Sequence, residues 1–130
     1  MKDILKLLKK KDDFYAKEGA SGADIKAAEK ELGLTFAKDY KKYLEAYSVV
    51  SADGHEFTGI IESDRLNVVS ATIKEKKKNS NIDDSMYVIE RLDIDGIIIW
   101  QSSKGAIYQT VNQGEPEEIY KSFYEYVDNE

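Results

Sequence analysis

The chain has 130 residues, of which 42% are hydrophobic and 34% charged, with eight glycines and one proline, a composition typical of one ordinary soluble domain. It contains no cysteine, which excludes disulfides, thiolate zinc sites, iron–sulfur clusters and cysteine nucleophiles. Its formal charge of -6 argues against nucleic acid as the partner, because the phosphate backbone is itself negative, and favours a basic partner.

Charged residues interrupt every apolar run near the N-terminus. Within residues 1–15 a lysine or an aspartate follows each short run, so no stretch has the length of a signal-peptide core or a membrane span. We therefore expect no membrane association. Together with the lack of cysteine, this favours a cytoplasmic location.

The first half of the chain has the periodicity of helices. Apolar residues recur at helical spacing in three segments, residues 3–16, 21–33 and 38–48. Ser21 and Asp24 form a capping pattern at the start of the second segment, and Gly33 supplies a left-handed residue at its end. Three helices are therefore expected before most of the strands.

The second half has a different period. The pattern predicts a strand over residues 56–61, a helix over 66–78, strands over 86–92, 97–101 and 106–111, and a last helix over 119–127. We therefore expect one α+β domain over residues 1–130. A mainly antiparallel sheet of about four to six strands would be packed against N-terminal helices and a C-terminal helix.

His55 is the single histidine and the first candidate for catalysis. It follows Asp53 closely, so an Asp53–His55 pair is the candidate proton relay. No serine-nucleophile motif or metal-ligand partner accompanies the pair. We therefore expect His55 to be a loop residue that bonds a neighbouring carbonyl, and we expect the chain not to be an enzyme.

The stretch Asp93-Ile-Asp95-Gly96 invites comparison with a calcium-binding loop. With Gly96 at the sixth position of an EF-hand loop, Arg91 takes position one and Ser102 position twelve, and neither suits calcium there. The stretch instead predicts a hairpin turn in which Asp95 and Gly96 adopt positive φ angles. No metal site is expected.

The aromatic residues favour burial, with a contact surface as the alternative. Trp100 ends the apolar run of residues 97–100, which predicts a central, buried strand. An exposed Trp at a strand end would instead anchor an interface. Tyr40, Tyr43 and Tyr47 share one helix face, so we expect them half-buried with hydroxyls at the rim, although tyrosine is also favoured at interfaces.

Four lysines lie at the end of the helix expected before the later strands: Lys74, Lys76, Lys77 and Lys78. The run is short and has no interleaved aromatic residue, and cations are favoured at a helix C-terminus in any case. It therefore predicts a solvated helix end and no nucleic-acid site.

Acidic residues gather in the last part of the chain. Residues 81–130 hold 11 acidic and three basic residues, a net charge of -8. A group of them is expected on loops that flank two adjacent strands: Asp83, Asp84, Glu90, Asp93 and Asp95. Attraction of a partner and negative charge for solubility both explain this group.

Three segments of the first half resemble a known family. They are Gly19-Ala-Ser-Gly-Ala-Asp-Ile25, followed by Ala28-Glu-Lys-Glu-Leu-Gly-Leu34, and Phe36-Ala-Lys-Asp-Tyr40-Lys-Lys-Tyr-Leu44. The strand segments at 87–90, 95–100 and 105–108 and the ending Phe123-Tyr-Glu-Tyr126 continue the match. Residues 18–127 thus resemble the SUKH superfamily, also called the SMI/KNR domain, in which a sheet follows N-terminal helices. That family usually has proline where this chain has Ala37, which weakens the signal for a helix start.

The resemblance implies a role in protein binding. Bacterial members of the family are immunity proteins that bind and neutralise a cognate secreted toxin, often a nuclease, and no catalytic residue or cofactor comes with that role. We therefore expect a cytoplasmic protein that captures a basic toxin through Glu56, Asp83, Asp84, Asp93 and Asp95. A regulatory interaction adaptor, as in fungal members, and a small enzyme built on the single histidine are the alternatives.

Overall fold

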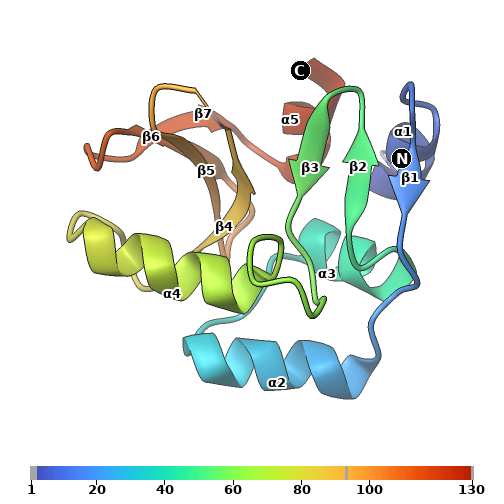
Figure 1. Cartoon of the computed structure of the whole chain (residues 1–130), viewed down its shortest axis with the longest axis horizontal. Helices are drawn as coiled ribbons and strands as arrows, with labels where there is room; N and C mark the ends of the chain where they lie inside the picture. The colour runs from blue at the N-terminus through green and yellow to red at the C-terminus, as the bar shows by residue number, and fades with distance from the viewer. Residues whose placement is uncertain (1–2, 93, 130) are drawn as a thin grey trace.

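Helices and two groups of strands alternate along residues 3–92 and 94–129, the part of the chain that the computed structural model describes (Figure 1). The helices are α1 (Ile4–Lys9), α2 (Gly22–Leu32), α3 (Lys38–Ala46), α4 (Val68–Lys78) and α5 (Phe123–Asn129). The strands are β1 (Tyr15–Ala16), β2 (Val50–Ala52), β3 (His55–Phe57), β4 (Met86–Arg91), β5 (Ile97–Ser102), β6 (Ile107–Val111) and β7 (Glu117–Tyr120). The predicted α+β domain is confirmed.

The larger sheet is antiparallel and has the strand order β4-β5-β6-β7. β5 lies inside this sheet, where Trp100 is paired with Val88 of β4 and with Tyr108 of β6. Trp100 is fully buried, whereas the first two residues of β5 are half-buried. The predicted central strand is therefore confirmed, and the prediction that its whole apolar run is buried is wrong at its first two residues.

The turn before β5 has the expected geometry. Asp95 and Gly96 have φ angles of 54° and 62°. Two successive positive φ angles match the right-handed twist of the flanking strands, which is why an Asp-Gly pair favours a hairpin here. Asp93 lies outside the described residues.

A smaller antiparallel sheet has the order β1-β2-β3 and was only partly predicted. The expected helix over residues 3–16 is wrong beyond Lys9. Asp13 takes a φ of 56°, which a helix does not accommodate, and the chain then pairs as β1. Asp53 and Gly54 form the turn between β2 and β3, with φ angles of 50° and 81°.

Thr58, the residue after β3, links the two sheets. Its backbone N–H donates to the carbonyl of Ile89 at 2.9 Å, and its hydroxyl donates to the carbonyl of Val88 at 2.8 Å. These bonds bring β3 beside β4, so that the two sheets enclose one core with α3 and α5.

The tyrosines of α3 lie deeper than expected. Tyr40 and Tyr43 have no exposed surface, and their hydroxyls lie 2.9 Å from the Thr58 hydroxyl and 2.7 Å from the Thr58 carbonyl respectively. The expectation of half-burial is wrong for these two and holds for Tyr47. Burial raises the pKa of the phenols of Tyr40, Tyr43 and Tyr87, because phenolate would lose its solvation there.

Ala37, which stands where the family usually has proline, makes a bond that proline cannot make. Its backbone N–H donates to the hydroxyl of Tyr87 at 2.9 Å, and this hydroxyl donates to Gln101 at 2.7 Å. Gln101 in turn donates to Asp39 at 2.9 Å. The start of α3 is thereby fixed to the sheet by a buried chain of hydrogen bonds, and Ala37 itself provides no side-chain cap.

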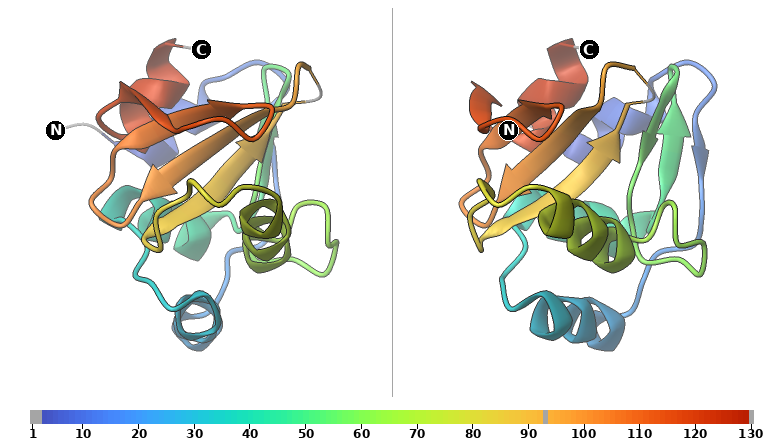
Figure 2. Two further views of the ribbon diagram at one scale, coloured as in Figure 1. Left: turned by 90° about the vertical axis from the view of Figure 1, so that its left-hand side faces the viewer. Right: turned by 60° about the vertical axis from the view of Figure 1, so that its left-hand side comes forward.

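α4 packs on the face of the larger sheet that points away from α3 and α5 (Figure 2). Ala71 of this helix forms a second apolar cluster with Met86, Val88 and Trp100. The predicted helix with lysines at its end is confirmed. Lys76 is half-buried and donates to the carbonyl of Asp84 at 3.1 Å, so the end is not solvated throughout.

The end of the chain combines a strand and a helix where one helix was expected. Residues 119–127 have helical spacing of apolar residues, yet Ile119 belongs to β7, which pairs with β6. The helix starts only at Phe123, where the hydroxyl of Ser122 accepts from the N–H of Glu125 and Asp39 accepts from the N–H of Phe123. These caps fix the start that periodicity alone placed too early.

Candidate functional site

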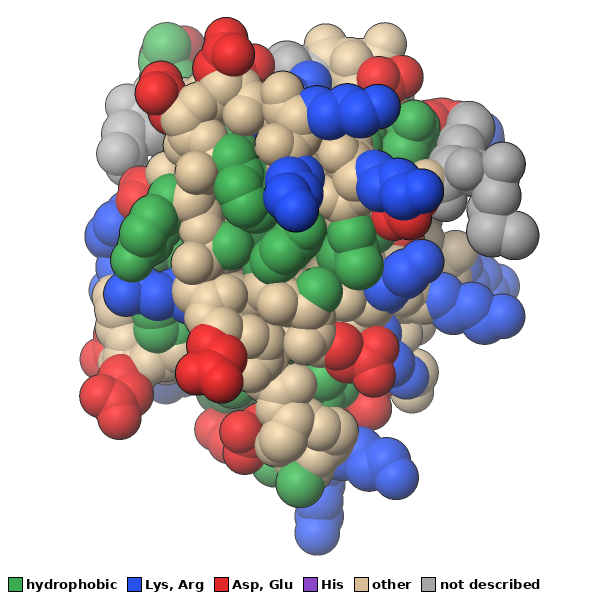
Figure 3. Space-filling model, turned by 90° about the vertical axis from the view of Figure 1, so that its right-hand side faces the viewer, with side chains coloured by type: hydrophobic (Ala, Val, Ile, Leu, Met, Phe, Trp, Pro, Cys, Tyr) green, Lys and Arg blue, Asp and Glu red, His purple; other side chains and the backbone are tan. Residues whose placement is uncertain are grey.

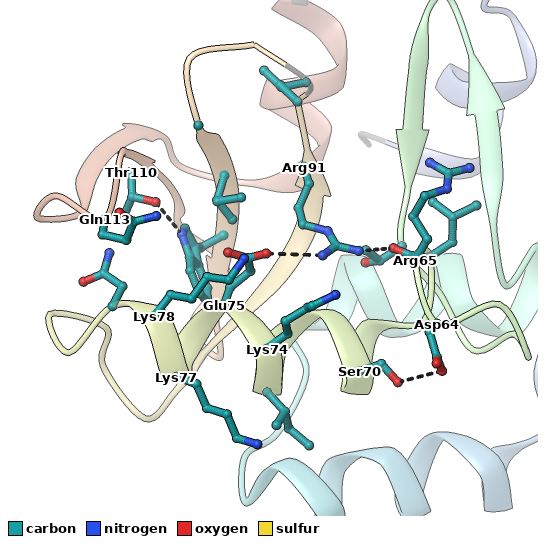
Figure 4. Close-up of a pocket in the computed structure, with 18 of the residues that line it drawn as sticks. Asp64, Arg65, Ser70, Lys74, Glu75, Lys77, Lys78, Arg91, Thr110 and Gln113 are labelled. Atoms are coloured by element: carbon teal, nitrogen blue, oxygen red, sulfur yellow. Dashed lines mark hydrogen bonds and ion pairs between the residues drawn. The ribbon is translucent and has the colours of Figure 1, made fainter.

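A groove of about 900 Å³ lies between α4 and the outer face of the larger sheet (Figure 4). We call it the α4 groove. We call the sheet side of the groove its floor, and Ile98 and Trp100 of β5 and Thr110 of β6 line it. α4 forms one wall, and Arg65 and Arg91 lie at one end (Figure 4). The sequence predicted the helix and the strands that border this groove. It gave no signal for the groove itself, because the groove depends on how these elements pack.

The groove exists because α4 covers only part of the sheet. The helix packs on β4 and fully buries Trp100, whereas Ile98, in the next row of the sheet, packs against the edge of that cluster and stays half-exposed. The indole N–H of Trp100 donates to the hydroxyl of Thr110 at 3.0 Å. The polar groups of Trp100 and Thr110 are thus paired with each other, and both residues are almost fully buried, so the floor is exposed mainly at the apolar side chain of Ile98.

Two arginines and two glutamates form a network at one end of the groove. Arg91 donates to Glu75 at 3.2 Å and also to the backbone carbonyl of Arg65. Arg65 donates two bonds to Glu56, at 2.7 and 3.1 Å. These bonds lower the pKa of Glu56 because they stabilise its charged form.

The lysines of α4 add positive charge to the groove. Lys74 and Lys78 extend on the side of the helix that faces the strands, and Lys77 extends on the other side (Figure 4). Within the described part of the chain these three lysines have no ion pair. The α4 groove therefore has an excess of positive charge in a chain whose net charge is -6.

The acidic residues predicted to form one contact set lie at two ends of β4. Asp83 and Asp84 precede this strand, whereas Asp95 follows it in the turn to β5, and Glu56 lies near that second end beside Glu90. A strand of this length spans about 17 Å, so the structure does not bring the two pairs together. The exposed carboxylates of Asp83 and Asp84 remain neighbours.

The carboxylate of Asp83 organises the loop before β4. Its Oδ1 atom accepts from the N–H of Ser85 at 2.7 Å and from the Ser85 hydroxyl at 2.6 Å. These bonds lower the pKa of Asp83. The loop therefore presents fixed negative charge at this end of the molecule.

Glu90, expected among the surface acids, is buried, which corrects that expectation. It is 2% exposed, and its carboxylate accepts from the Tyr126 hydroxyl at 2.5 Å and lies 2.9 Å from Nδ1 of His55. His55 is thus a residue of β3 paired with a carboxylate, and the expectation of a loop histidine bonded to a carbonyl is wrong. A charged residue inside the otherwise apolar run of β4 was the sequence signal for this cluster.

The side of the molecule around β1 carries a further candidate surface, where apolar side chains gather beside Lys and Arg side chains (Figure 3). Tyr15 is 58% exposed, and the ammonium of Lys17 lies 5.6 Å from the centre of its ring. Phe14 and Tyr47 pack edge to face with ring centres 5.3 Å apart. The α4 groove, with a volume of about 900 Å³, lies elsewhere and is therefore the stronger candidate.

Among residues 3–92 and 94–129, no group of His, Asp or Glu side chains is arranged to hold a metal ion. No helix in the same part of the chain combines the length and apolar character needed to cross a membrane.

Comparison with known proteins names a family. No curated protein matches the sequence. The family model SUKH_5, described as SMI1-KNR4 cell-wall, matches residues 1–130. This match covers the whole chain, and it agrees with the resemblance found in the helix and strand motifs. The chain therefore belongs to the SUKH (SMI1/KNR4) family.

Proposed function

We propose that the protein is an immunity protein, which binds a cognate toxin in the cytoplasm and blocks its activity. The observation that carries this proposal is the match of the family model to residues 1–130. Bacterial members of the SUKH superfamily have this role. It requires a stable binding surface and no catalytic activity of the immunity protein. The well-packed α+β domain provides such a surface.

A charged edge supports capture of a basic toxin. Asp83 and Asp84 are exposed side by side on the loop before β4, and residues 81–130 have a net charge of -8. A field of one sign speeds the encounter with a partner of the opposite sign. We assign the first contact to Asp83 and Asp84, with Asp95 as a separate acidic point at the far end of β4.

Glu56 is a weaker candidate for that contact than the sequence indicated. Its carboxylate receives both hydrogen bonds from Arg65 and is therefore largely neutralised within the chain. Glu56 more simply serves to hold Arg65 at the end of the α4 groove.

A regulatory interaction adaptor is the second candidate function. The family description, SMI1-KNR4 cell-wall, names no toxin, and the resemblance to fungal members of the family implies this adaptor role. An adaptor would bind its partner and leave the partner active, whereas an immunity protein would abolish the activity.

The test is a protection assay with the toxin candidate encoded beside the gene. The candidate is expressed under an inducible promoter in a test host, with or without the full chain. We expect growth to be restored by the chain, and the purified pair to form a complex in which both proteins keep their intact masses. Binding that leaves the toxin activity unchanged would favour the adaptor, and modification of the toxin would show catalysis.

A further inference from the structure

We propose that the α4 groove binds an extended peptide segment in which acidic and apolar residues alternate. This inference concerns a surface separate from Asp83 and Asp84 and does not depend on the toxin proposal. It rests on the charges of the groove, the spacing of two lysines and the apolar floor.

The charges of the groove are the first argument. Five basic and three acidic side chains line it. Two of the acids are ion-paired, Glu75 with Arg91 at 3.2 Å and Glu56 with Arg65 at 2.7 Å. Asp64 accepts only from the neutral hydroxyl of Ser70 at 3.4 Å and keeps its charge, which leaves three lysines of α4 against one carboxylate. The uncompensated charge is positive and belongs to α4, which favours a ligand with carboxylates.

A helix C-terminus explains only part of this charge. Cations within the last turn are stabilised by the helix dipole, and Lys77 and Lys78 lie there. Lys74 lies one turn earlier, where that stabilisation has largely faded, yet it is exposed and faces the groove (Figure 4). Its position is explained better by the groove than by the helix end.

The spacing of the two groove-facing lysines fits an extended chain. Lys74 and Lys78 are four residues apart, which places them about 6 Å apart along the helix axis. Alternate side chains of an extended peptide point to one side and repeat every 6.6 Å or about that distance. Two acidic residues separated by one position would therefore meet both lysines.

The floor of the groove selects the intervening residues. Side chains between the acidic positions point the other way, toward Ile98 and the buried edge of Trp100. Ile98 is half-buried in the free chain, so an apolar side chain placed on it would remove further apolar surface from water. The hydroxyl of Thr110 is already engaged by Trp100, so it does not demand a polar ligand.

The shape of the groove favours a peptide over a compact anion. A volume of about 900 Å³ lies near the upper end for small-molecule pockets, and the groove is open along α4. Lysine ammonium groups are point charges on flexible stems and do not form the rigid fork that grips a single phosphate. A segment of chain occupies such a space with several weak contacts.

The experiment measures the binding of a fluorescein-labelled peptide, in which glutamate and leucine alternate, to the full chain by anisotropy at physiological ionic strength, where the Debye length is about 8 Å. We expect the double variant Lys74→Glu/Lys78→Glu to bind about tenfold more weakly, because two attractive charge contacts become repulsive. The matched control is Lys26→Glu/Lys30→Glu, an exposed pair with the same spacing on α2 and the same change in net charge. The control should change affinity by no more than about twofold, since screened charges act over about one Debye length.

Two further comparisons separate the parts of the proposal. A peptide with serine in place of leucine should bind more weakly, and a peptide with lysine in place of glutamate should not bind. The emission of Trp100, the single tryptophan, should change on binding of the first peptide. If the double charge reversal disturbs the fold, Lys74→Gln/Lys78→Gln replaces it. The proposal would be overturned if the acidic peptide did not bind, or if the two double variants lost affinity equally. It would also be overturned if replacing leucine by serine left the affinity of the peptide unchanged.

Toxin protection by the Lys74→Glu/Lys78→Glu variant distinguishes this inference from the proposed function. A variant that loses the peptide and still protects leaves the immunity proposal intact and assigns the groove to another partner. Normal peptide binding by the variant would overturn the groove assignment. Failure of the wild-type protein to protect would, independently, overturn the immunity proposal.

Discussion

The Nδ1 atom of His55 lies 2.9 Å from Oε2 of Glu90, so a half-buried imidazole on β3 pairs with a carboxylate of β4 that is 2% exposed. The same carboxylate accepts from the hydroxyl of Tyr126 on α5 at 2.5 Å and from the N–H of Glu56 at 3.3 Å. Glu90 therefore joins both sheets and the last helix through one buried carboxyl group.

Replacement of Glu90 should destabilise the fold in proportion to what it leaves unpaired. Glu90→Leu removes every acceptor of the cluster and should lower the free energy of unfolding by about 3 to 5 kcal/mol. Glu90→Gln keeps the shape and one acceptor oxygen, and should cost about 1 to 3 kcal/mol. Urea unfolding followed by circular dichroism measures both. A Glu90→Leu protein as stable as wild type would show that the cluster does not hold the two sheets and α5 together.

Alkaline pH should unfold the protein through its buried tyrosines. Burial raises the pKa of Tyr40, Tyr43 and Tyr87 above the ordinary value of 10.0. Below pH 10 these phenols are neutral in both states, so stability is unaffected. Above pH 10 only the unfolded chain releases the protons, and stability should fall by about 1.4 kcal/mol per tyrosine for each further pH unit, until the folded pKa is reached.

The measurement is the urea midpoint from pH 8 to pH 11, together with phenolate absorbance. Tyr43→Phe should reduce the steepness of the fall, because it removes one of the three groups. The matched control is Tyr15→Phe, since Tyr15 is 58% exposed and lies outside the buried group of tyrosines. Ionisation of all tyrosines near pH 10 with the fold retained would contradict this prediction.

Gly59 should tolerate no side chain. A Cβ at this position would overlap the backbone carbonyl oxygen of Ser48 and lie 2.9 Å from a methyl of Val49. The backbone of Gly59 is also fixed, because its N–H donates to Leu66 and its carbonyl accepts from Val68, both at 2.8 Å. Gly59→Ala should therefore cost at least about 2 kcal/mol of stability.

Gly22→Ala is the matched control for Gly59→Ala. A Cβ on Gly22, the first residue of α2, meets no atom within 4 Å. This substitution should be neutral or stabilise by up to about 1 kcal/mol, because alanine loses less entropy than glycine in a helix. Equal effects of the two substitutions on the thermal midpoint would show that the close approach of residues 48 and 59 is not rigid.

Local signals explain why parts of the fold could be predicted. α2 lies where the sequence placed it because Ser21 accepts from the N–H of Asp24 and Gly33 adopts a φ of 69°, both of which depend on neighbours in the chain. β7 was missed because Ile119 and Phe123 have helical spacing. Only pairing with β6 and the cap at Ser122 decide that the first belongs to a strand and the second to a helix.

The candidate site could be predicted less well, because its surfaces combine distant segments. The lysines of α4 were visible in the sequence, but their relation to Ile98 depends on how far α4 covers the sheet. Asp83 and Asp95 looked like one acidic group because they are close in sequence. The strand between them carries them to opposite ends, and sequence proximity cannot show that separation.

The acidic pair before β4 should govern how fast a basic toxin associates. Asp83→Lys/Asp84→Lys should slow association about tenfold at low salt and much less at high salt, because screening shortens the reach of charge to about 8 Å at physiological ionic strength. Stopped-flow or surface plasmon resonance at several salt concentrations measures this effect. The dissociation rate should change little, since exposed charges act mainly on the encounter.

Two controls make the measurement of this acidic pair specific. Glu31→Lys/Glu45→Lys makes the same change in net charge at exposed positions of α2 and α3, and should slow association less. Asp84→Lys alone keeps the bonds from Ser85 to Asp83, so a loss of rate in this variant cannot come from a disturbed loop. An association rate indifferent to salt and to both Asp83 and Asp84 would show that the toxin docks on another face.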